Sequence, residues 1–68
     1  MIDYSLSHKL HAKARRLQAE SYRVTAQACK AEGDLEGEAF YNLHAIQYDG
    51  FAETYEGLAK PEASDESP

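Results

Sequence analysis

The stretch FYNLHAIQYDGFAETYEGLA, residues 40–59, decides the fold, because tyrosine and alanine recur in it at helical spacing. Steps of four and three residues place this line on one face of a helix. With the apolar residues on the adjoining faces, apolar groups cover roughly three quarters of the circumference, more than one partner helix can bury. The line is Tyr41, Ala45, Tyr48, Ala52, Tyr55 and Ala59, and the adjoining set is Ala39, Phe40, Leu43, Ile46, Phe51 and Leu58.

A first helix is expected over about residues 5–32, beginning among the capping residues Asp3, Ser5 and Ser7. Its apolar seam alternates large and small residues at heptad spacing, which lets a second helix approach closely. A second line of small residues lies beside Tyr22 and Cys29 and offers room for another neighbour. The seam is Leu6, Leu10, Ala14, Leu17, Ser21, Val24, Ala28 and Ala31, and the second line is Ala12, Ala19 and Ala26.

Gly33 and Asp34 predict the end of the first helix and the start of the second, which is expected over about residues 34–60. So short a connection makes the two helices antiparallel. Pro61 is expected to end the second helix, since the residue before proline avoids the helical conformation. Residues 61–68 are small, acidic and without apolar periodicity, and are expected to form a disordered tail.

A chain of 68 residues has one domain, here residues 1–60, and its own core supplies only a few kcal/mol. The expected fold is therefore all-α: an antiparallel two-helix hairpin that dimerises into a four-helix assembly. In that assembly the seam of residues 6–31 is expected to pack on Phe40, Leu43, Phe51 and Leu58. The expected dimer and core residues are Leu10, Leu17, Val24, Phe40, Leu43, Ile46, Phe51 and Leu58.

The two halves of the chain carry opposite charge. Residues 1–32 hold six basic and three acidic residues, whereas residues 33–68 hold nine acidic residues against Lys60 alone. Opposite halves favour folding back on each other or pairing between two copies, and two solvated faces of opposite sign are an equal alternative. Basic residues recur every seventh position over about 31 Å of the first helix, which is also typical of an RNA-binding face. This basic line is Lys9, Arg16, Arg23 and Lys30.

Candidate ligands for a metal site lie too far apart in a hairpin. His8, His11, His44 and Cys29 are of zinc-ligand type, but His11 and Cys29 are separated by about 27 Å of helix. Two helices also cannot enclose a pocket that orients a substrate. The sequence therefore predicts neither an enzyme, nor a metal site, nor a cofactor.

The cellular location follows from cysteine usage and from hydropathy. Cys29 is the single cysteine, and the chain shows no secretory leader and no long apolar run. These features predict a protein of the reducing cytoplasm that does not enter a membrane.

The tyrosine line is the best candidate for protein binding, because tyrosine combines a large rigid contact area with a hydroxyl group. We expect its three tyrosines to contact a partner protein, with Tyr22 and His44 nearby and two arginines at the rim. The alternative reading is that the tyrosines only build an interface between two copies of the chain. The candidate contact residues are Tyr41, Tyr48, Tyr55, Tyr22, His44, Arg16 and Arg23.

Size, helicity, a lone cysteine and an acidic end together resemble small phage-encoded helical hairpins that inhibit host regulators, namely quorum-sensing anti-activators and anti-CRISPR proteins. That resemblance implies a homodimeric inhibitor or modulator that sequesters a host regulatory protein such as a transcription factor. In outline the chain is also similar to the Rop-like plasmid copy-number regulators, which implies, as an alternative, RNA binding by the basic face of the first helix. Both resemblances lie in architecture, and neither transfers a functional residue.

Overall fold

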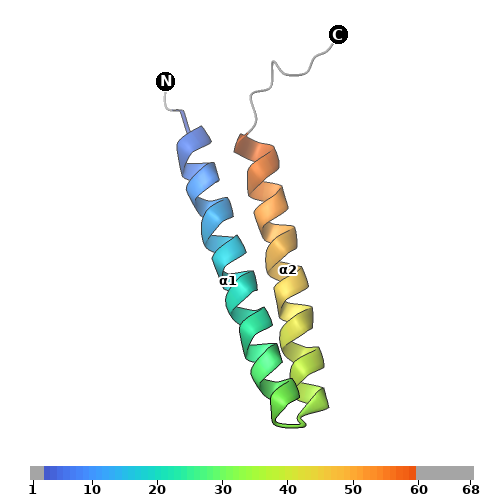
Figure 1. The fold of residues 1–68 in the computed structure, drawn as a ribbon. Coiled ribbons are helices and arrows are strands. Elements are labelled where there is room, and N and C mark those ends of the chain that lie inside the picture. The colour runs from blue at the N-terminus through green and yellow to red at the C-terminus, as the bar shows by residue number, and fades with distance from the viewer. Residues whose placement is uncertain (1–2, 60–68) are drawn as a thin grey trace.

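The computed structural model describes residues 3–59, which form two antiparallel α-helices and no strand. Helix α1 runs from Ser5 to Ala31 and helix α2 from Leu35 to Ala59. Figure 1 shows them side by side, with the connection at one end and the start of α1 beside the end of α2. The all-helical hairpin is thus confirmed. The expected stop at Pro61 and the expected tail, residues 61–68, lie outside the described residues.

Local hydrogen bonds fix the helix ends. A carboxylate oxygen of Asp3 accepts the Ser5 N–H at 2.9 Å, which lowers the pKa of Asp3. Gly33 takes the left-handed conformation, with φ of 82°, and the Asp34 N–H donates to the Cys29 carbonyl at 2.8 Å. The Asp34 carboxylate then accepts the Gly37 N–H at 2.9 Å, which caps the start of α2. Gly33 and Asp34 therefore play the two parts that the sequence predicts for them.

The contact between the helices is made of alanine. Ala19, Ala45 and Ala52 are each 0% exposed, and every other buried residue except Cys29 is also an alanine. Because alanine ends at Cβ, two alanine lines let the helix backbones approach closely. The buried residues within 3–59 are Ala12, Ala19, Ala26 and Cys29 of α1, and Ala45, Ala52 and Ala59 of α2.

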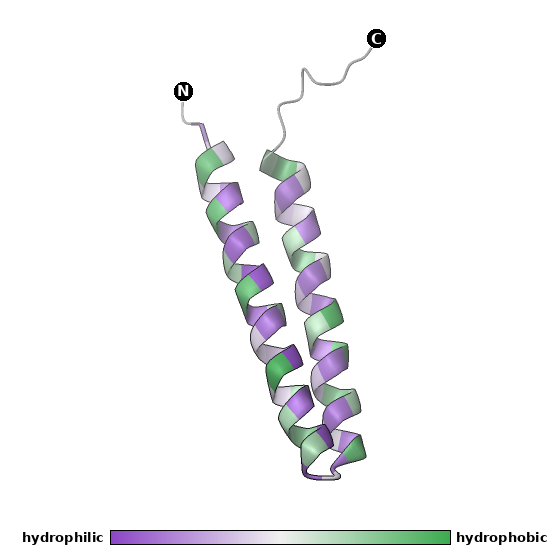
Figure 2. Ribbon diagram, viewed as in Figure 1, coloured by the Kyte–Doolittle hydropathy of each residue, from purple (hydrophilic) through white to green (hydrophobic). Residues whose placement is uncertain are grey.

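Within one chain the leucine seam does not pack on α2, and its packing against a second copy stays a prediction. Every leucine, both phenylalanines, Val24 and Ile46 are more than half exposed in the described part of the chain. Leu17 and Ala19 are two residues apart, so their side chains point about 200° apart around α1. By burying the alanine line, α1 turns the leucine seam away from α2, and Figure 2 shows hydrophobic residues recurring along both helices rather than only between them.

The exposed set contains all the residues expected in the core or in a dimer interface. It comprises Leu10, Leu17, Val24, Phe40, Leu43, Ile46, Phe51 and Leu58, together with Leu6 and Leu35.

Candidate protein-binding surface

The tyrosine line of α2 faces α1. Tyr41, Tyr48 and Tyr55 are half-buried and alternate with the buried alanines of the same helix. The Tyr22 ring of α1 lies 6.1 Å from that of Tyr41 and 5.3 Å from that of Tyr48. Burial, followed by the neighbouring Tyr48, raises the pKa of Tyr22. The tyrosines expected to contact a partner are therefore also contacts of the hairpin itself.

Histidines extend this aromatic row along the hairpin. The His44 ring lies 5.3 Å from that of Tyr22. Towards the start of α1, the His11 ring stacks on Tyr55 at 5.0 Å and the His8 ring lies 6.2 Å from it. Offset ring contacts of this kind add to the burial of the small alanine core. The tyrosine rings are half-buried, so only part of each ring remains available to a partner.

One edge of the hairpin is closed by ion pairs. Arg16 contacts Asp49 at 3.0 Å and Glu56 at 2.9 Å, and Arg23 also pairs with Asp49. The hydrogen bond from Arg23, then that from Arg16, lowers the pKa of Asp49, and the two carboxylates raise the pKa of Arg16. The opposite charges of the two halves thus meet within one chain at this edge.

These ion pairs change the expected role of the arginines. Arg16 and Arg23 were expected at the rim of a partner interface and on the RNA-binding line, but each already contacts a carboxylate of α2. Two of the four basic residues on that line are therefore neutralised locally. Lys9 and Lys30, at its two ends, are exposed and have no ion pair among the described residues.

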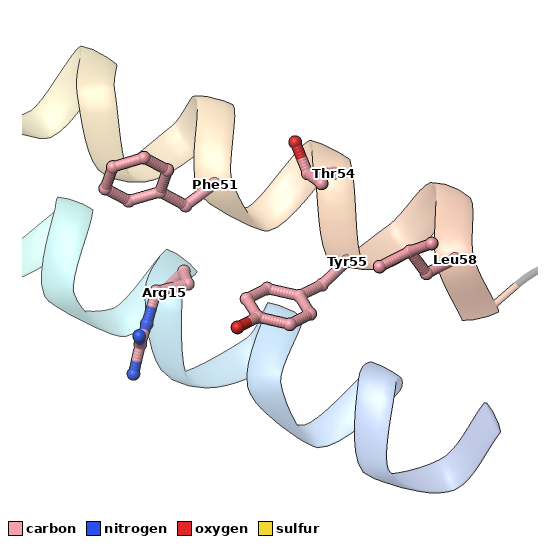
Figure 3. Close-up of a pocket in the computed structure, with 5 residues that line it drawn as sticks. All are labelled: Arg15, Phe51, Thr54, Tyr55 and Leu58. Carbon is pink, nitrogen blue, oxygen red and sulfur yellow. The ribbon is translucent and has the colours of Figure 1, made fainter. Parts of the chain in front are cut away.

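A groove of about 370 Å³ opens between the helices, lined by Arg15, Phe51, Thr54, Tyr55 and Leu58. Figure 3 shows Phe51 and Tyr55 on the side of α2 that faces α1, with Arg15 of α1 across from Phe51 and its guanidinium group pointing away from both rings. The Arg15 Nε is buried and has no hydrogen-bond partner within the described residues. The walls of the groove are mostly apolar, which suits an apolar side chain.

Two further apolar surfaces lie on the outside of the hairpin. We call Leu10, Leu17 and Val24, with the small residues between them, the α1 outer seam; those small residues are Ala14, Ser21 and Ala28. We call Phe40, Leu43 and Ile46 the α2 outer face, since residues three apart share one side of a helix. Leu17 is 57% exposed and Leu43 is 53% exposed. Sequence reasoning assigned the large residues of both surfaces to the core or to a dimer interface.

Cys29 is buried, and burial, followed by Asp34, Glu32 and Glu38, raises the pKa of its thiol, so little thiolate forms at neutral pH. No group of three or more histidine, cysteine, aspartate or glutamate side chains in residues 3–59 is placed to hold a metal ion. Neither described helix is long and apolar enough to cross a bilayer.

Comparison with other proteins adds no further assignment: no family model, curated protein or solved structure matches the chain.

Proposed function

We propose that the chain is a small non-catalytic protein-binding module that captures a regulatory protein, such as a transcription factor, and blocks or redirects it. The observation that supports this proposal is the exposure of every large aliphatic side chain and both phenylalanines within residues 3–59. Soluble proteins rarely leave so much contiguous apolar surface open unless it docks on something. Capture would be stoichiometric, because the hairpin binds and does no chemistry.

The surface on α2 suits an amphipathic helix as the partner element. The α2 outer face and the neighbouring groove offer apolar positions at helical spacing, which is how a helix lies in a groove. Glu36 and Glu53 are exposed and have no ion pair among the described residues. They suit a partner helix whose apolar stripe is flanked by lysine or arginine. Proteins that bind DNA carry such basic surfaces, which supports a transcription regulator as the target.

The tyrosine line has a double role in this proposal. Tyr55 lines the groove, so its ring edge is open to a partner while its face stacks on His11. The other rings beside this surface are half-buried, namely Tyr41, Tyr48, Tyr22 and His44. Replacing one of these rings therefore weakens the hairpin as well as the docking surface. Residues of the α2 outer face are the cleaner probes of docking.

The test compares two variants of α2 that add the same charge. Leu43→Glu places it on the α2 outer face, and Asn42→Glu places it one residue away on the edge that faces the arginines. Tagged wild type and the Asn42→Glu control should retain the same protein from a lysate of the source cells, and Leu43→Glu should not. The retained protein, purified and mixed with the hairpin, should form a complex of fixed stoichiometry and lose DNA binding. Equal retention by Leu43→Glu, or unchanged DNA binding in the saturated complex, would contradict the proposal.

RNA binding by the basic line of α1 is the alternative function, and it is tested with different variants. Because Arg16 and Arg23 also hold the hairpin together, Lys9→Glu with Lys30→Glu is the sharper variant pair. This alternative requires saturable binding of structured RNA. The slope of the logarithm of the binding constant against the logarithm of the salt concentration should be smaller by about 2 in the double variant. Unsaturable RNA binding whose affinity is unchanged in the double variant would exclude this alternative.

A further inference from the structure

We infer that the α1 outer seam is self-complementary and pairs antiparallel with the same seam of a second copy, Lys13 of each copy facing Glu20 of the other. The dimer that the sequence predicts thereby has a defined surface and register. Pairing through α1 does not depend on capture of a foreign protein, which uses α2. An experiment can therefore contradict one proposal without contradicting the other.

The α1 outer seam has the geometry of a coiled-coil interface. Leu10, Leu17 and Val24 recur every seventh residue, with small residues between them, so large and small side chains alternate along one stripe. The stripe points about 200° away from the buried Ala19 line. A second copy therefore reaches the seam without disturbing the contact between α1 and α2.

The register follows from placing large residues against small ones, as the hairpin does internally. There Tyr22 lies between Tyr41 and Tyr48, the two tyrosines that flank the fully buried Ala45. In an antiparallel pair of α1 helices, Leu17 faces Ala14 of the second copy and Leu10 faces Ser21 of the second copy. Both pairs are centred midway between residues 15 and 16, so one two-fold axis satisfies them together.

Charge complementarity selects the same arrangement. Lys13 and Glu20 are exposed, flank the seam on one side and have no ion pair among the described residues. Their midpoint lies within one residue of that axis, so each Lys13 meets a Glu20 of the other copy, twice per dimer. A parallel pairing would instead set Lys13 beside Gln18 and Glu20 beside Thr25, with no opposite charge. Flanking charges of this kind decide partner and orientation in coiled coils.

Helix α2 has no comparable seam. The positions seven and fourteen residues after Leu43 are Gly50 and Gly57, and its other apolar residues shift from the outer face to the groove. A continuous repeating stripe is therefore a property of α1 alone. That difference assigns the second copy to α1 and leaves α2 for another partner.

The first experiment measures molar mass by light scattering and sedimentation equilibrium on the whole chain. Wild type should be a dimer, and Leu17→Glu should weaken dimerisation at least about a hundredfold, because two leucines leave an apolar contact. Helicity measured by circular dichroism should persist, since Leu17 is 57% exposed in the hairpin. The matched control Leu43→Glu should remain a dimer. A monomeric wild type, a dimeric Leu17→Glu, or dissociation by Leu43→Glu would overturn the inference.

The second experiment tests the register by exchanging charges. Lys13→Glu and Glu20→Lys should each weaken the dimer about tenfold, because each creates two like-charge contacts. The double variant K13E/E20K should restore affinity to within about threefold, and a mixture of the two single variants should form heterodimers. Failure of the double variant to recover, or absence of heterodimers, would contradict this register. Retained partner capture by Leu17→Glu would show that docking on α2 stands independently.

Discussion

At the scale of single residues, alanine sets the distance between the helices. Ala19 and Ala52 are fully buried, and the rings of Tyr22 and Tyr48 fill the space beside them. A larger side chain in the alanine line has no free volume to enter, because the facing positions hold half-buried rings or backbone.

Replacing one of these alanines should therefore destabilise the hairpin. We expect Ala19→Leu to lower the free energy of unfolding by about 1–3 kcal/mol, the usual cost of overpacking. The matched control is Ala39→Leu at an exposed position of α2, which should change stability little. Urea unfolding followed by circular dichroism measures both. A free energy of unfolding for Ala19→Leu equal to that of the wild type would mean that the alanine line is not the interface.

The glycines of α2 should differ in the same way. A Cβ on Gly37 would lie 2.8 Å from the Asp34 carboxyl carbon and 2.9 Å from the Cys29 sulfur, whereas a Cβ on Gly50 would meet nothing within 4 Å. Gly50→Ala should therefore stabilise the chain by about 1 kcal/mol through helix propensity. In Gly37→Ala the steric clash of the added Cβ should outweigh the gain in helix propensity, so the melting temperature should fall. A stabilising Gly37→Ala would contradict the geometry of the turn.

At the scale of the helices, the two edges of the hairpin differ. One edge is charged and joins α1 to α2 through Arg16, Arg23 and Asp49, and the other holds the groove beside Phe51 and Leu58. Each ion pair is partly exposed and worth little alone, but the shared carboxylate of Asp49 links two arginines into a network.

This network should make stability depend on pH in the acid range. The pKa of Asp49 lies below its ordinary value of 3.8 in the folded chain, so its contribution is fully present above that value. It should be lost as the pH falls through the folded pKa. Asp49→Asn should therefore unfold more easily than wild type at pH 7 and lose less stability on acidification. Glu53→Gln, which removes an acid outside the network, is the control, and identical pH profiles for wild type and Asp49→Asn would contradict the assignment.

The helices and their turn are predictable from sequence because their signals are local. Gly33 and Asp34 specify the turn by backbone conformation and capping alone. The face by which the helices pack is not local, because the Leu17 line and the Ala19 line both repeat every seventh residue. The choice depends on α2, whose large tyrosines require small residues opposite them. The alternation of tyrosine and alanine in residues 41–59 was the signal that selects the Ala19 line.

The candidate site was therefore predicted only in part. The association of Tyr22 with His44 follows from their level in an antiparallel hairpin. The ion pairs of Arg16 and Arg23 depend on the rotation of both helices, which their own sequence does not specify. The same rotation exposes Leu17 and Leu43, which hydrophobicity alone places in a core.

At the scale of the whole molecule, the hairpin is a single layer of two helices with its large aliphatic side chains and phenylalanines exposed. An alanine interface buries little apolar area, so one copy alone is marginally stable. Pairing through the α1 outer seam would bury leucines that the fold leaves in water. We expect the melting temperature to rise by about 3–5 °C for each tenfold rise in protein concentration. Leu17→Glu should remove this dependence. A wild-type melting temperature that does not change with protein concentration would contradict pairing through the α1 outer seam.

The most direct test of which face packs inside the chain is a cysteine-protection measurement. With Cys29 replaced by serine, Ala19→Cys and Leu17→Cys place thiols on opposite sides of α1. Alkylation of the thiol in folded Ala19→Cys should be slow at every protein concentration. In dilute protein the thiol of Leu17→Cys should react as fast as one in an unfolded peptide, and it should become protected only as the protein concentration rises. Fast alkylation at position 19 with protection at position 17 in dilute protein would mean that leucine, not alanine, holds the helices together.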